Sequence, residues 1–109
     1  MDTIGEPFVL DDGRTIKVRS FTLDAHERLT KADVWADLSS GDEERFNRGL
    51  RLVLWEQVRR QFPDTKLESV GELIEYDRRA EFIETVTRVI KRKTEAKAGE
   101  ASGQRTSTN

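Results

Sequence analysis

The sequence EPFVLDDGRTIKVR, from Glu6 to Arg19, decides the fold of this chain. Two short runs of apolar and β-branched residues flank Asp11-Asp12-Gly13, which is typical of a β-hairpin with a tight turn. A two-residue loop of Asp12 and Gly13 would split the apolar side chains between both faces of the ribbon. A three-residue loop with Gly13 in the left-handed region instead gathers four apolar side chains on one face, namely Phe8, Leu10, Ile16 and Val18.

An isolated two-stranded ribbon is marginally stable in water, so we expect this apolar face to pack on helices later in the chain. Either Thr22 or Asp24 is the predicted N-cap of the first helix, with Glu27 as a capping-box partner of Asp24. Small apolar side chains then follow at helical spacing. They predict one continuous helix as far as Ser39, with a narrow inner stripe of Ala25, Leu29, Ala32 and Ala36.

The second predicted helix runs from Asp42 to about Phe62 and is stopped by Pro63. Its apolar side chains cover about half of its circumference, which is a broader arc than one neighbouring helix can bury. Either several elements surround this helix, or part of the arc binds a partner.

Two further helical segments complete the expected fold. Ser69 and Glu72 form a predicted capping box for a short helix, and Asp77 is the predicted N-cap of an amphipathic final helix. The apolar face of the final helix consists of Phe82, Ile83, Val86, Val89 and Ile90. The predicted fold class is therefore mainly α, with an N-terminal β-hairpin followed by a small bundle of three to four helices.

We expect a single hairpin-plus-helices domain over residues 1–93. Residues 94–109 contain no Val, Ile, Leu, Met or aromatic side chain. Because such a segment cannot bury enough apolar surface to offset the entropy of ordering, it is predicted to be a disordered polar C-terminal tail.

The composition excludes several kinds of chemistry. The chain has no Cys and a single His, so thiolate catalysis, Cys-based zinc sites and His clusters are excluded. The lone His26 is expected on the surface, and no phosphate-binding glycine motif occurs. We therefore expect no catalytic residue, no metal site, no cofactor and no enzymatic activity. Without a signal sequence or an apolar run of membrane-spanning length, the protein is predicted to be cytoplasmic.

Basic clusters at residues 59–60, 78–79 and 88–93 leave a small DNA-binding regulator open as an alternative. A pI near 5.5 and a net charge of −2 disfavour a nucleic-acid ligand. Acidic side chains dominate residues 1–44 and basic ones dominate residues 45–109. This uneven charge is compatible with self-association or with binding to another protein.

Four large side chains are candidate protein-binding residues. On the second predicted helix, Leu52, Trp55 and Phe62 lie on the outer part of the apolar arc, and Trp35 lies at the edge of the first helix's stripe. Partly exposed aromatic side chains are frequent interface anchors. The alternative is that these four side chains complete the core of a small domain.

The order of these elements also carries a family resemblance. A short strand, an Asp-Gly turn and a second strand precede Phe21-Thr22-Leu23, which opens a helix, and LESVGELIEYD (67–77) leads into the last amphipathic helix. This arrangement, over residues 6–93, resembles the small tail assembly chaperones of long-tailed bacteriophages and prophages.

The resemblance implies a non-enzymatic protein of the bacterial host cytoplasm that binds the long, largely helical tape measure protein. It also implies that the protein helps tail tube subunits to polymerise around that client. A different phage structural component, such as a head–tail joining protein, is a further alternative and would form a stable ring.

Overall fold

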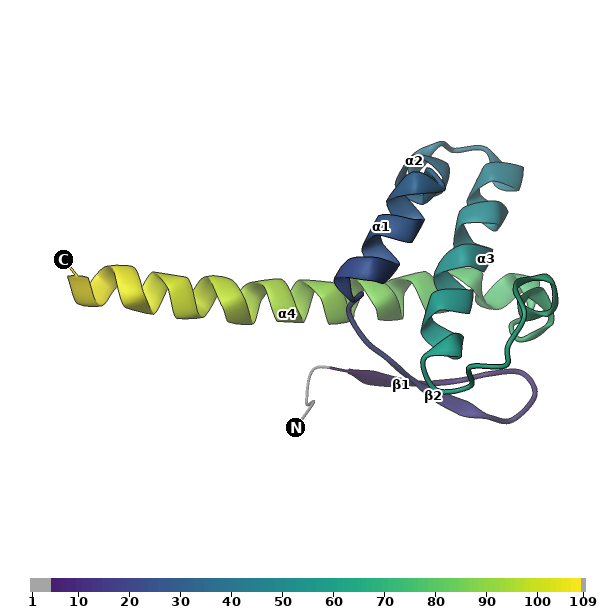
Figure 1. Cartoon of the computed structure of the whole chain (residues 1–109), viewed down its shortest axis with the longest axis horizontal. Helices are drawn as coiled ribbons and strands as arrows, with labels where there is room; N and C mark the ends of the chain where they lie inside the picture. The colour runs from purple at the N-terminus through teal and green to yellow at the C-terminus, as the bar shows by residue number, and fades with distance from the viewer. Residues whose placement is uncertain (1–4, 109) are drawn as a thin grey trace.

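In the computed structural model, 63% of the chain is helical and a two-stranded antiparallel hairpin stands at the N-terminus, as predicted. The structure describes residues 5–108, with side chains described as far as residue 94. The elements in chain order are β1 (Glu6–Val9), β2 (Thr15–Val18), α1 (Leu23–Lys31), α2 (Val34–Ser39), α3 (Glu43–Arg59), the 3-10 helices η1 (Leu67–Glu72) and η2 (Tyr76–Arg78), and α4 (Arg79–Thr108). In the view of Figure 1, α1 and α2 rise above the long α4 and the hairpin lies below it.

The hairpin has the register that the sequence predicts. Phe8 pairs with Ile16 across the two strands, and the Leu10 N–H donates to the Arg14 carbonyl at 2.7 Å. Gly13 has a φ of +93°, in the region that L side chains rarely adopt. The three-residue loop and the glycine at positive φ are therefore confirmed.

The apolar face of the hairpin forms one side of the core. Phe8, Leu10, Ile16 and Val18 are all buried, and the ring of Phe8 meets that of Phe82 edge-on, with 5.3 Å between the centroids. Strand β1 contacts α4, and β2 contacts both α3 and α4. These contacts supply the packing that a hairpin lacks on its own.

The outer edge of β2 is hydrogen-bonded by Gln57 of α3 and by Gln61 just after it. Gln57 Oε1 accepts from the Arg19 N–H at 3.0 Å, and Gln57 Nε2 donates to the Arg19 carbonyl at 2.5 Å. Gln61 Oε1 accepts from the Lys17 N–H. An open strand edge can pair with another chain, and these two side chains occupy backbone groups of Lys17 and Arg19 along this edge.

The prediction of one continuous helix up to Ser39 is wrong, because the helix breaks at Asp33, which has a φ of +63°. Asp tolerates the left-handed region better than most residues. After this break, α2 no longer continues the face of α1, so Ala25 and Leu29 are buried while Ala32 and Ala36 are exposed.

Asp37 is a residue that α2 turns inward, and its side chain is completely buried. Its carboxylate accepts from Arg48 Nε and Nη2 at 3.0 and 2.8 Å and from Arg45 Nε at 3.0 Å. The guanidinium of Arg48, followed by that of Arg45, lowers the pKa of Asp37 to about 2. A Cβ on Gly49 would lie 3.1 Å from Asp37 Cβ, so α2 and α3 approach closely there. We call Asp37, Arg45, Arg48 and Gly49 the α2–α3 corner.

The predicted capping box at Ser69 is also wrong. Ser69 Oγ donates to the Lys66 carbonyl at 3.1 Å instead of capping a helix, and η1 is a 3-10 helix that starts at Leu67. Asp77 lies within η2 and is not the N-cap of α4. The segment still buries its apolar residues Val70, Leu73 and Ile74. Because the segment is too short for a stable α-helix, the packing of these side chains determines its backbone conformation.

The final helix α4 has the predicted apolar face. Phe82, Val86 and Val89 are buried, and Ile83 and Ile90 are partly buried against the same core. This face packs α4 against the hairpin, and Lys93 of α4 lies in one hollow with Thr22, the N-cap of α1.

The disordered tail over residues 94–109 stays a prediction. Helix α4 continues to Thr108, and Figure 1 shows this part extending away from the rest of the molecule. Ala, Glu, Lys, Gln and Arg are good helix formers, and they lengthen an existing helix without the cost of a new nucleus. A domain boundary after residue 93 stays a prediction.

Candidate functional site

The four predicted protein-binding residues are all partly buried. Leu52 and Trp55 are on α3 and Phe62 follows it, whereas Trp35 is on α2. Each packs against the core with part of its surface. Their role as binding residues stays a prediction, and the structure gives each a different environment.

Trp55 links α3 to the segment that follows it. Its indole Nε1–H donates to the Thr65 carbonyl at 3.0 Å, and the guanidinium of Arg59 lies over its ring at 4.4 Å from the centroid. The polar edge of this indole therefore has an internal partner, and one ring face is covered by a cation.

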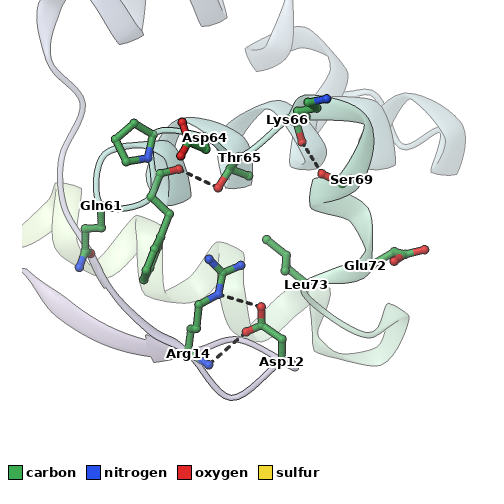
Figure 2. Close-up of a pocket in the computed structure, with 11 residues that line it drawn as sticks. Asp12, Arg14, Gln61, Asp64, Thr65, Lys66, Ser69, Glu72 and Leu73 are labelled. Atoms are coloured by element: carbon green, nitrogen blue, oxygen red, sulfur yellow. Dashed lines mark hydrogen bonds and ion pairs between the residues drawn. The ribbon is translucent and has the colours of Figure 1, made fainter.

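Phe62 lines a groove between the hairpin turn and the segment from α3 to η1, which we call the hairpin groove (Figure 2). Its volume is about 740 Å³. Figure 2 shows Arg14 pointing into this space, where Arg14 Nε donates to Asp12 Oδ2 at 2.8 Å. The guanidinium of Arg14 also lies over the Phe62 ring at 4.4 Å from its centroid.

Two hydroxyl groups of the hairpin groove form hydrogen bonds within the segment from α3 to η1. Thr65 Oγ1 donates to the Phe62 carbonyl at 2.7 Å, and Ser69 Oγ donates to the Lys66 carbonyl at 3.1 Å. The lining carries both signs of charge, with Arg14 and Lys66 against three acidic residues, Asp12, Asp64 and Glu72. Such a mixed lining selects no single class of charged ligand.

Trp35 lies in a second, more apolar hollow of about 410 Å³, which we call the aromatic groove. The indole Nε1–H of Trp35 donates to Thr30 Oγ1 at 2.9 Å. The centroid of the Trp35 ring lies 5.9 Å from that of Phe21 and 5.4 Å from that of His26. The groove is lined by Ser20, Phe21, His26, Trp35 and Ile90.

Sequence reasoning found one residue of the aromatic groove and missed the others. His26 is exposed, as expected, but its ring also lines the groove. Phe21 directly precedes Thr22, whose hydroxyl accepts from the Ala25 N–H at 3.1 Å and caps α1. An apolar residue just before an N-cap commonly packs beside the first helical turn, so this position was a usable signal.

A third hollow adjoins the aromatic groove, and we call it the basic pocket. Its volume is about 220 Å³, and it contains three basic side chains from distant parts of the chain, Arg19, Arg60 and Lys93. The remaining lining residues are Gly5, Ser20, Phe21, Thr22 and Val89. In the sequence, Arg60 and Lys93 belong to separate basic clusters and Arg19 to none of them, which is why their convergence was missed.

Two other cations of α4 are engaged elsewhere. Arg88 Nη2 lies 3.0 Å from Glu6 Oε1, and Arg92 pairs with the same carboxylate. The guanidinium of Arg88 holds the pKa of Glu6 below its ordinary value. The carboxylate of Glu6 is thus paired with two cations that lie outside the basic pocket.

None of the helices in the described residues 5–108 combines the length and the apolar composition of a membrane span. No described group of three or more His, Asp or Glu side chains is placed to hold a metal ion. Known protein families, curated proteins and solved structures give no match to this chain.

Proposed function

We propose that this chain is a non-enzymatic tail assembly chaperone of a phage or prophage, which binds a tape measure protein and promotes assembly of the tail tube. The order of a hairpin, a capped helix and a final amphipathic helix supports this proposal through the family resemblance. The mainly helical fold with its N-terminal hairpin is compatible with it.

The aromatic groove is the observation that carries the proposal. It is a preformed hollow in which Trp35 and Phe21 present ring surface beside the aliphatic Ile90. Large aromatic side chains fixed in a hollow are characteristic anchors for a protein partner. A groove of this kind suits an apolar side chain on one face of a partner helix.

A helical client fits this surface for a physical reason. A tape measure protein exposes apolar helical faces until tube subunits enclose it, and exposed apolar area drives aggregation. A small protein that covers such a face keeps the client soluble and yields to the tail tube protein during polymerisation. No chemical step is needed for this role.

Co-expression with the tape measure protein, which the proposal requires to be encoded directly downstream of this chain, tests the proposal. The wild-type chain should raise the soluble fraction of the client and co-purify with it. Trp35→Ala should remain folded by circular dichroism and lose the client, because truncating an interface aromatic typically costs about 2 kcal/mol or more of binding free energy. A client that is equally insoluble with and without the wild-type chain would refute the chaperone role.

Two further variants complete this experiment. Tyr76→Ala removes an aromatic ring that is 62% exposed on another part of the surface, so it should leave client solubility unchanged. Trp55→Ala tests the surface predicted from the sequence on α3. If Trp55→Ala is folded and loses the client while Trp35→Ala retains it, the interface lies on α3 and not at the aromatic groove.

A further inference from the structure

A fourth hollow lies where η1 packs against the middle of α3, and we call it the Arg51 pocket. Its volume is about 190 Å³. It is lined by Asn47, Leu50, Arg51, Leu54, Gly71, Ile74, Tyr76 and Arg79. Among the described residues, it has no lining residue in common with the aromatic groove or the hairpin groove. The Arg51 pocket is therefore a separate site from the one proposed for the client.

Three aliphatic side chains form the apolar part of the Arg51 pocket. Leu50, Leu54 and Ile74 are all buried. The two leucines lie on the same face of α3 as Asn47 and Arg51, because the four residues recur at helical spacing. An apolar group that enters the pocket therefore meets aliphatic carbon directly beside two polar side chains of α3.

The guanidinium of Arg51 lies against the backbone of η1. A Cβ on Gly71 would lie 2.7 Å from Arg51 Nη1 and 3.2 Å from Arg51 Cζ, so any side chain at position 71 would displace the guanidinium. The neighbouring Arg45 and Arg48 of α3 are both bonded to the carboxylate of Asp37. Arg51, in contrast, forms no hydrogen bond or ion pair with any residue that the structure describes. Its N–H groups are therefore available to an anionic ligand.

A second donor lies next to Arg51 and is held in place by Arg79. Arg79 Nη1 donates to Asn47 Oδ1 at 2.5 Å, which orients Asn47 and leaves its Nδ2 group to donate elsewhere. Arg79 is itself fixed, because its Nε donates to the Tyr76 carbonyl at 3.0 Å and its guanidinium lies over the Tyr76 ring at 3.7 Å from the centroid. Glu43 Oε1 lies 3.8 Å from Arg79 Nη2 and balances part of its charge. A ligand in the pocket would thus be attracted mainly by Arg51.

From this arrangement we propose that the Arg51 pocket binds the C-terminus of a partner chain that ends in an aliphatic residue. The terminal carboxylate pairs with the guanidinium of Arg51 and accepts from Asn47 Nδ2, and the last side chain packs on the aliphatic lining. A guanidinium and a carboxylate match in a planar, bidentate pair.

The size of the pocket favours a chain terminus over a larger ligand. Small-molecule sites typically enclose roughly 300–1,000 Å³, and the Arg51 pocket is smaller. A terminal residue carries its carboxylate and its side chain on a single Cα, so one residue supplies both groups that the pocket can bind. The inference is independent of the proposed function, because it requires no helical client.

Three labelled peptides test the site on the full chain. They share a short Gly-Ser stem and end in Leu with a free carboxylate, in Leu with an amide, or in Ser with a free carboxylate. Fluorescence anisotropy should show the free Leu peptide binding about tenfold or more tightly than the other two, because the amide removes the charge and Ser removes the apolar contact. Equal affinity of the free Leu peptide and either twin would refute the proposal.

Matched variants of the protein locate the binding. Arg51→Gln changes an exposed side chain, so it should remain folded by circular dichroism and bind the free and amidated Leu peptides alike. Gly71→Ala keeps the charge but displaces the guanidinium, and it should weaken the free Leu peptide. Lys66→Gln removes a positive charge from the hairpin groove and should change nothing. If Arg51→Gln and Lys66→Gln weaken the free Leu peptide equally, the peptide senses overall charge and the site is refuted.

Other occupants give distinct outcomes that would also overturn the proposal. An amidated peptide with an internal Glu beside Leu, binding as tightly as the free Leu peptide, would assign the pocket to an acidic side chain. Inorganic phosphate that displaces the free Leu peptide, where acetate at equal ionic strength does not, would assign the pocket to a phosphate group. Loss of the free Leu peptide in Trp35→Ala would place its binding at the aromatic groove.

Discussion

The β-hairpin and the α2–α3 corner are both tightly packed, but the residues that determine their structures are separated by different distances in the sequence. In the hairpin, alternating apolar side chains and Gly13 set the register within a single short stretch. At the corner, the buried carboxylate of Asp37 depends on Arg45 and Arg48, eight and eleven residues further on. The hairpin was predicted correctly from the sequence, and the corner was not.

The difference shows that the burial of a polar side chain cannot be predicted from the pattern of apolar residues in the sequence. An Asp within an apparently amphipathic helix is normally assigned to the solvent face. Asp37 is buried because two arginines that are themselves partly exposed fold over it, and a buried carboxylate needs such partners. The same holds for Glu56, which is 2% exposed and receives two hydrogen bonds from Arg28.

The largest expected effect is in the hairpin. Ile16→Ala should lower the free energy of unfolding by about 2–5 kcal/mol, because Ile16 is fully buried and its loss leaves a cavity in the core. Val9→Ala is the control on the opposite face, where Val9 is 53% exposed, and it should change stability by less than about 0.5 kcal/mol. Urea denaturation of both variants measures the difference, and similar effects would contradict the register.

At the corner, Gly49→Leu should lower the free energy of unfolding by about 1–3 kcal/mol, because the larger side chain overpacks the contact between α2 and α3. A Cβ at this position would lie 3.1 Å from Asp37 Cβ and 3.2 Å from Leu38 Cδ2, so α2 would have to move away from α3. Gly49→Ala should cost less, since better helix propensity offsets part of the strain. Gly49→Leu melting like the wild type would show that the two helices do not pack closely here.

The turn of the hairpin offers a smaller test. Gly13→Val should lower the free energy of unfolding by about 1–2 kcal/mol, because a β-branched residue strongly disfavours a positive φ. No steric clash adds to this loss, since a Cβ at this position would have no atom within 4 Å. Gly13→Asn should be milder, since Asn tolerates the left-handed region. Thermal unfolding of the pair measures the effect, and an equal loss for Val and Asn would argue against backbone strain as the cause.

The ion pair of the corner predicts an effect that is confined to acid solution. The pKa of Asp37 is lowered from 3.8 to about 2 in the folded protein, so its stabilisation is complete above the unfolded value and is lost as the pH falls toward the folded value. The stability difference between wild type and Asp37→Asn should therefore be constant above about pH 5 and shrink below pH 4. Urea midpoints across this range measure it, and a pH-independent difference would show that Asp37 does not titrate with a lowered pKa.

The smallest expected effect is at the C-terminus. Truncation after Lys93 should leave the melting temperature within about one degree of the wild type, because residues 94–109 carry no large apolar side chain to bury. Helical content measured by circular dichroism should fall, since α4 continues to Thr108. A much lower melting temperature or aggregation of the truncated chain would move the domain boundary beyond residue 93.

In the candidate site, as in the fold, one part could be predicted from the sequence and the rest is visible only in the tertiary structure. Trp35 was identified from its place at the edge of an apolar stripe, which is local information. The aromatic groove also needs Phe21 and Ile90, and the basic pocket needs Arg19, Arg60 and Lys93. No spacing rule connects residues so far apart, and Arg60 and Lys93 each have a local explanation as charges near the end of a predicted helix.

The sequence by itself determined the hairpin loop and register, the N-terminal boundary of α3 at Asp42, and the apolar face of α4. Each follows from interactions within a few residues: the two-residue period of strands, a capping side chain, or the 3.6-residue period of helices. Only the tertiary structure decided the break at Asp33, the glutamine edge on β2 and the two adjoining hollows. These depend on contacts such as those between the Gln57 side chain and the backbone of Arg19, 38 positions apart in the chain. Such contacts exist only once the core has packed the helices against the hairpin.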